Sequence, residues 1–170
     1  MQVSPWMIDS PFAILTAIVA PAVLTNACSV LALGTANRVA RVVDRTRAVT
    51  AEIANHESGS ELHSMLSHQL ELLRVRGKLL VRALRFAYMA LGGFASSALI
   101  AVIGGALTHF RYAPALKAAA VVGLTIGVLS VSGLVMACAF IVRETTLAID
   151  NLAEEANAYS KALAKHPPQR

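Results

Sequence analysis

Three long apolar segments without a charged residue dominate this chain. They cover residues 11–36, 86–108 and 118–142. A hydrocarbon core of about 30 Å requires about 20 apolar residues in a helix that rises about 1.5 Å per residue. All three segments exceed that length, and 56% hydrophobic with 15% charged residues fits helices that face lipid. The sequence therefore predicts an all-α integral membrane protein with three transmembrane helices in a single membrane domain, residues 1–170.

The basic residues are distributed unevenly between the connecting segments. Residues 37–85 hold nine of the fifteen Lys and Arg residues, whereas residues 109–117 hold two. Basic loops are retained on the cytoplasmic side of a membrane. We therefore expect residues 37–85 and the C-terminal tail to be cytoplasmic and the N-terminus to lie outside. The same clustering explains the basic pI through topology and anionic lipid, so nucleic acid is not an expected partner.

The helices are expected to continue beyond the bilayer into a cytoplasmic helical bundle. Residues 37–55 contain neither Pro nor Gly, and apolar residues recur there and in residues 62–84 at heptad-like spacing. This pattern predicts an antiparallel coiled hairpin over residues 37–85, with Gly77 at a skipped apolar position. A C-terminal helix over residues 143–165 carries an apolar stripe that is expected to pack against this hairpin. The stripe consists of Ile149, Leu152, Ala156, Tyr159 and Leu163.

Small residues recur at helical spacing in the second and third apolar segments. They include Gly93, Ser97, Gly105, Gly123 and Gly127. In lipid there is no hydrophobic drive between helices, and small residues favour association by letting two backbones approach closely. The pattern predicts close helix packing, either within one chain or between copies.

A polar stripe follows one face of the first predicted helix. It consists of Asn26, Ser29, Asn37, Arg41 and Asp44. The Asn26 amide lies within the apolar segment, where it must find a partner or water. One hypothesis is a pore formed by several copies and lined by this stripe, with the helix weakened at Pro21. The alternative is an ordinary interhelical hydrogen bond.

The densest charged motif is the run NRVARVVDRTR at residues 37–47. One interpretation is a basic collar that attracts anions or lipid head groups at the cytoplasmic face. The other is a topological anchor whose arginines form salt bridges to Glu71, Glu144 or Asp150.

No residue pattern in the chain indicates catalysis or a cofactor. The His and Glu residues between positions 52 and 68 lack the spacing of metal ligands, and no nucleophile motif or phosphate-binding loop occurs. Cys28 and Cys138 lie inside apolar segments and do not predict a disulfide. We therefore expect no enzyme activity, no metal site and no cofactor.

Three motifs together resemble a known family. The run NRVARVVDRTR, the segment ELLRVRGKLLVRA at residues 71–83 and the pair Arg143-Glu144 are similar to a bacterial family of small three-span proteins catalogued as domain of unknown function 2721. The resemblance extends over residues 10–152. It implies a location in the bacterial inner membrane and implies no activity.

Two functions remain as hypotheses after these exclusions. The first is a homo-oligomeric ion channel or pore lined by the first helix. The second is a non-catalytic scaffold or accessory subunit of a larger complex. In either case the expected partners are the lipid bilayer, anionic lipid at the cytoplasmic face and further copies of the chain.

Overall fold

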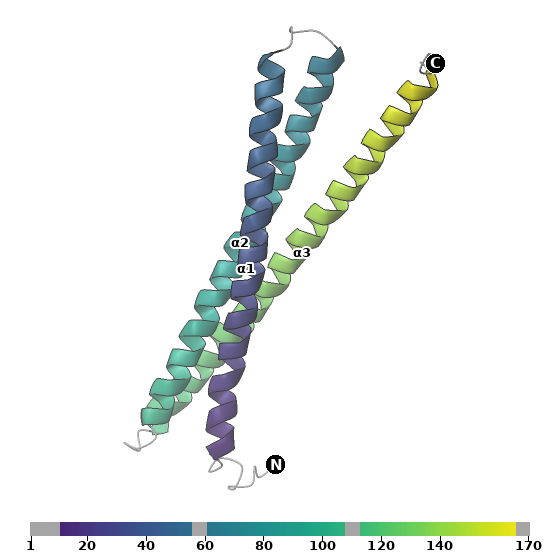
Figure 1. Cartoon of the computed structure of the whole chain (residues 1–170). Coiled ribbons are helices and arrows are strands. Elements are labelled where there is room, and N and C mark those ends of the chain that lie inside the picture. The colour runs from purple at the N-terminus through teal and green to yellow at the C-terminus, as the bar shows by residue number, and fades with distance from the viewer. Residues whose placement is uncertain (1–10, 56–60, 108–112, 166–170) are drawn as a thin grey trace. The chain divides into compact units, whose positions relative to one another are not determined.

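The computed structural model consists of three long helices (Figure 1). It describes the backbone of residues 11–55, 61–107 and 113–165, and the side chains of residues 19–55, 63–104 and 117–153. Helix α1 spans Pro11–Ala54, α2 spans Glu61–Leu107 and α3 spans Ala113–Lys165. No strand occurs in the described ranges. The prediction of an all-α chain with three long helices is therefore confirmed.

Each helix is about twice as long as the approximately 20 residues that cross a bilayer. Helix α1 has 44 residues, α2 has 47 and α3 has 53. The absence of Pro and Gly from residues 37–55 predicted the continuation of α1, which runs without a break to Ala54. Pro21 lies inside this continuous helix, and the Thr25 hydroxyl donates to the Pro21 carbonyl oxygen at 2.8 Å.

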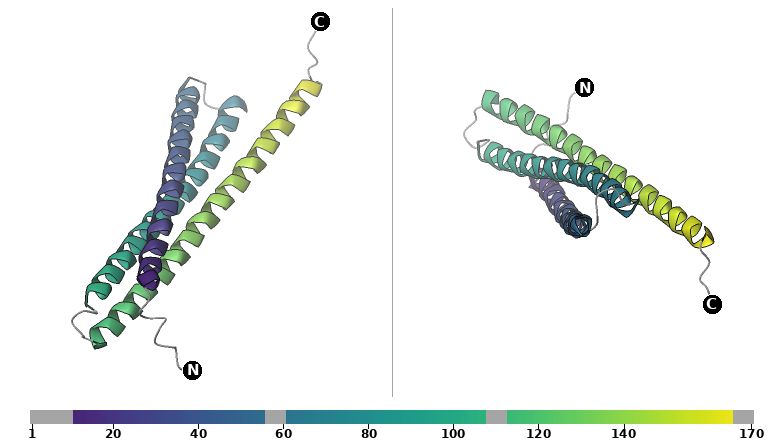
Figure 2. Two further views of the ribbon diagram at one scale, coloured as in Figure 1. Left: turned by 60° about the horizontal axis from the view of Figure 1, so that its bottom comes forward. Right: turned by 90° about the horizontal axis from the view of Figure 1, so that it is seen from above.

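The chain divides into two compact units, and every helix contributes to both. The first unit comprises residues 1–36 and 84–137, and the second comprises residues 37–83 and 138–170. The division follows the composition of the chain, since the first unit contains nearly all of the three apolar segments. Within this first unit α2 and α3 run side by side (Figure 2).

The first unit has a core of small and apolar side chains. One cluster joins Cys28 of α1 to Ala90 and Phe94 of α2, and a second joins Ala32, Ala87 and Ala137, one from each helix. Alanines at a three-helix contact allow the backbones to approach closely, and lipid-embedded helices gain dispersion energy from such contacts.

The second unit is organised around the hairpin of α1 and α2. Val42 and Val49 of α1 are buried with Leu66, Leu73 and Leu80 of α2 in one cluster. All five are among the apolar residues that recur at heptad-like spacing in residues 37–55 and 62–84. A Cβ placed on Gly77 would lie 3.7 Å from Val42 Cγ1, which is ordinary van der Waals contact.

The expected packing of the C-terminal stripe on the hairpin is wrong for Ile149 and Leu152, the two stripe residues whose side chains the structure describes. Ile149 is 61% exposed and Leu152 is 67% exposed. The reason is that α3 meets the hairpin through the polar side chains of Glu144 and Thr145 rather than through this apolar face. The remaining stripe residues, Ala156, Tyr159 and Leu163, lie outside the described side chains.

Candidate functional site

The most strongly buried charge in the described part of the chain belongs to Glu144 in the second unit. The residue is 2% exposed and lies two positions after the last apolar residue of its segment, Val142. A carboxylate removed from water loses several kcal/mol of hydration unless charged partners compensate. The surrounding helices must therefore supply cations.

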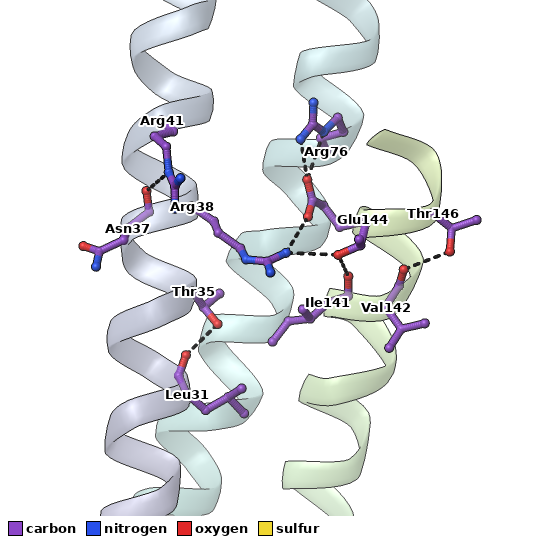
Figure 3. A network of polar contacts seen from close by, with 11 residues as sticks. Leu31, Thr35, Asn37, Arg38, Arg41, Arg76, Ile141, Val142, Glu144 and Thr146 are labelled. Atoms are coloured by element: carbon purple, nitrogen blue, oxygen red, sulfur yellow. Dashed lines mark hydrogen bonds and ion pairs between the residues drawn. The ribbon is translucent and has the colours of Figure 1, made fainter. Parts of the chain in front are cut away.

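Two arginines from different helices hold the two oxygens of this carboxylate (Figure 3). Arg76 of α2 donates from Nε at 2.9 Å and from Nη2 at 2.8 Å to Glu144 Oε1. Arg38 of α1 lies with Nη1 3.4 Å from Oε2. The carboxylate thereby joins all three helices of the second unit, and we call Arg38, Arg76 and Glu144 the charged triad.

Thr145 fixes the position of the Arg38 guanidinium. Arg38 Nη1 donates to the Thr145 hydroxyl at 3.0 Å, and that hydroxyl donates to the Ile141 carbonyl oxygen at 2.9 Å. The α3 backbone thus orients the group that receives Arg38. Because the carboxylate and the hydroxyl belong to consecutive residues, a single turn of α3 supplies both contacts to Arg38.

Of the three acidic residues predicted to pair with the 37–47 run, Glu144 is the one that does so. Glu71 instead pairs with Arg74 of its own helix at 3.6 Å, where both side chains are exposed. Asp150 forms no ion pair with any residue in the described ranges. The pairing of Arg38 with Glu144 therefore supports the anchoring interpretation of the basic run.

An open groove of about 400 Å³ lies beside the charged triad within the second unit. Besides the triad, its lining includes two further arginines of α1, Arg41 and Arg45. Four guanidiniums and one carboxylate give the groove three net positive charges. The three α1 arginines are spaced by three and four residues, so they occupy one face of the helix. We call this feature the arginine groove.

The five residues of the predicted polar stripe are all exposed. These are Asn26, Ser29, Asn37, Arg41 and Asp44. The Ser29 hydroxyl donates to the Thr25 carbonyl oxygen at 3.0 Å, and Arg41 Nε donates to the Asn37 carbonyl oxygen at 3.4 Å. The Asn26 side chain forms no hydrogen bond with the residues that the structure describes. Only Arg41 belongs to both the stripe and the arginine groove.

The small residues of α2 and α3 face one another within the first unit of a single chain. Gly93 faces Ser130, whose hydroxyl oxygen a Cβ on Gly93 would overlap. Ser97 Oγ donates to the Gly123 carbonyl oxygen at 3.2 Å, and a Cβ on Gly127 would lie 3.8 Å from Ser97 Oγ. Gly105 lies outside the described side chains. These small residues therefore lie where α2 and α3 of one chain pack closely together.

No cluster of metal-ligand side chains occurs among the residues described. No three His, Cys, Asp or Glu residues gather there in an arrangement that could hold an ion. Cys28 is a buried free thiol and Cys138 an exposed one.

The contact between Arg76 and Glu144 was not predicted from the sequence, in which Arg76 is one of nine basic residues between positions 37 and 85. The available signal was the position of Glu144, an acid directly after 25 uncharged residues at 118–142 and Arg143. An acid so close to the apolar segment requires a cation from a neighbouring helix. The sequence alone does not select among Arg74, Arg76 and Arg82 for that role, because the choice depends on the rotation of α2.

The three helices define the class of protein to which the chain belongs. All three helices are long and apolar enough to cross a membrane, which indicates a multi-pass α-helical membrane protein. The chain belongs to the family described as "Protein of unknown function (DUF2721)", whose model matches residues 18–154. This match bears out the resemblance noted in the sequence. No curated protein and no solved structure matches the chain significantly.

Proposed function

We propose that the chain is a homo-oligomeric channel of the bacterial inner membrane, with α1 lining the pore. The observation that carries the proposal is the exposed Asn26 amide, which lies inside an apolar segment and has no hydrogen bond to the described residues. In a bilayer such a group requires water or a second polar group. A water-filled passage between copies satisfies Asn26 and the other polar residues of the same helix face.

The proposed orientation places the N-terminus outside and the second unit in the cytoplasm. It rests on the nine Lys and Arg residues of positions 37–85. Cysteine labelling tests it after the native Cys28 and Cys138 are replaced. Ser4→Cys should react with an impermeant maleimide in intact cells, whereas Ser58→Cys should react only after permeabilisation. Labelling of Ser58→Cys in intact cells would contradict the proposed orientation.

Conductance of the purified protein in planar bilayers tests the channel. Asn26→Leu should close the narrow region by removing its amide, and Asn26→Asp should shift ion selectivity toward cations by adding a ring of charge. Thr125→Val is the matched control, because it removes an exposed hydroxyl from α3 and leaves α1 intact. A well-folded oligomer that never conducts, across voltage and pH, would rule out the channel.

Exposed apolar residues in the second unit favour a scaffold or accessory subunit as the second candidate. Met65, Ile149 and Leu152 are all more than half exposed, and the last two lie one helical turn apart on α3. Apolar groups outside the apolar segments gain stability when a partner covers them. Under this candidate, crosslinking should capture one stoichiometric partner protein, and Ile149→Ser with Leu152→Ser should abolish the capture without changing the fold.

A further inference from the structure

The arginine groove contains more positive charge than the protein itself neutralises. Arg76 directs Nε and Nη2 at Glu144, and Arg38 directs Nη1 at Glu144 and Thr145. Arg41 and Arg45 also line the groove, are exposed and form no ion pair with any described residue. Two arginines without an ion pair therefore line an open space of about 400 Å³, within the size range of small-ligand sites.

The nearby acids do not cancel this charge. Glu144 is already shared between Arg38 and Arg76. Asp44 is exposed and does not line the groove. Asp44 lies three residues from Arg41, about 60° around the helix, yet it forms no ion pair with Arg41 or Arg45. Arg41 and Arg45 can thus direct donors at an external anion. An arginine whose donors are already bound to a neighbouring acid cannot do so.

We infer that the arginine groove binds a phosphate group, with Arg41 and Arg45 as its ligands and the charged triad as its fixed wall. Guanidinium groups match phosphate oxygens in geometry and charge, and paired N–H donors bind them more strongly than neutral donors do. Glu144 holds Arg38 and Arg76 in place and leaves the net charge of the groove positive. The inference does not depend on whether the protein conducts ions.

The phosphate has two chemical sources, a lipid head group or a soluble phosphate compound. Arg38 and Glu144 each follow the last residue of an apolar segment by two positions. At about 1.5 Å per helical residue, this places them about 3 Å beyond the segment ends, with Arg41 about 8 Å and Arg45 about 14 Å beyond, so the groove begins at the depth of lipid head groups. The position favours an anionic lipid, and the experiment separates it from a soluble ligand.

Binding is measured on the full chain in two formats. In the first, delipidated protein is titrated with phosphatidylglycerol in neutral detergent micelles, and bound lipid is counted by native mass spectrometry. In the second, inorganic phosphate is titrated against the protein in nanodiscs of neutral phosphatidylcholine, and thermal unfolding is followed. Saturable lipid binding with no phosphate effect identifies the head group, and a phosphate-dependent rise in Tm identifies a soluble ligand.

The variant Arg41→Gln with Arg45→Gln should weaken binding about tenfold or more, because it removes two guanidinium charges from the groove. The control variant Arg47→Gln with Arg82→Gln removes two exposed charges of the same unit that do not line the groove, and should bind like the wild type. All four positions are exposed, so both variants should keep the wild-type helix content. Equal losses in both variants, or no binding in either format, would overturn the proposal.

Discussion

At the scale of single residues, the charged triad makes an asymmetric prediction for Arg76 and Glu144. Arg76→Met removes both short hydrogen bonds to a carboxylate that stays buried, and should cost about 3 kcal/mol in the free energy of unfolding. Adding Glu144→Gln to Arg76→Met should recover part of this loss, because no buried charge remains. Reversible unfolding in mixed micelles, arranged as a double-mutant cycle, measures the coupling.

The exposed pair of Arg74 and Glu71 is the matched control for this cycle. It has an N–O distance of 3.6 Å and both side chains are about 60% exposed. Arg74→Met should change the free energy of unfolding by less than about 1 kcal/mol, because water solvates both charges. Additive effects of the Arg76 and Glu144 substitutions would show that the two side chains are not coupled in the folded protein.

Gly92 and Gly93 are neighbours in the sequence, but alanine substitution is expected to lower the Tm at only one of them. A Cβ on Gly93 would overlap the Ser130 hydroxyl oxygen, whereas a Cβ on Gly92 meets nothing within 4 Å. Gly93→Ala should therefore lower the Tm and Gly92→Ala should not. Over-packing of this kind costs about 1–3 kcal/mol. Ser130→Gly combined with Gly93→Ala should restore part of the loss, and no rescue would mean that the two positions do not face each other.

At the scale of elements, the hairpin of α1 and α2 has an unfilled position at Gly77. A glycine in a helix interior lowers the free energy of unfolding by about 1 kcal/mol relative to alanine. Because the added Cβ would rest 3.7 Å from Val42 Cγ1 without overlap, Gly77→Ala should stabilise the protein by about that amount. Thermal unfolding in detergent checks this, and a lower Tm would show that the two helices approach more closely than this contact.

The sequence predicted the elements better than their contacts. Apolar length and the absence of helix-breaking residues were enough to anticipate α1 beyond residue 36, and heptad-like spacing anticipated the cluster around Val42 and Leu73. The partner of Arg38 could only be narrowed to three acids, because the relative rotation of helices is not encoded in spacing along one helix. For the same reason the exposure of Ile149 and Leu152 was not foreseen.

At the scale of the whole molecule, a single chain leaves Asn26 and large apolar surfaces exposed, which predicts self-association. Lipid covers apolar side chains well, but it offers no hydrogen bond to an amide. Identical subunits most often close into cyclic assemblies. We therefore expect native mass spectrometry and mass photometry in mild detergent or nanodiscs to report one defined homo-oligomer.

The same measurement shows whether Asn26 helps to hold the copies together. Hydrogen bonds between membrane helices average about 0.6 kcal/mol, so Asn26→Leu should raise the dissociation constant about threefold for each bond lost. Thr125→Val should leave it unchanged, because that hydroxyl is satisfied by the Val121 carbonyl oxygen of its own helix at 2.8 Å. Gly123→Leu should instead disrupt the chain itself, since even a Cβ there lies 3.3 Å from Ile100 Cγ2 of the same chain. A monomer under every condition would contradict self-association and remove the basis for a pore between copies.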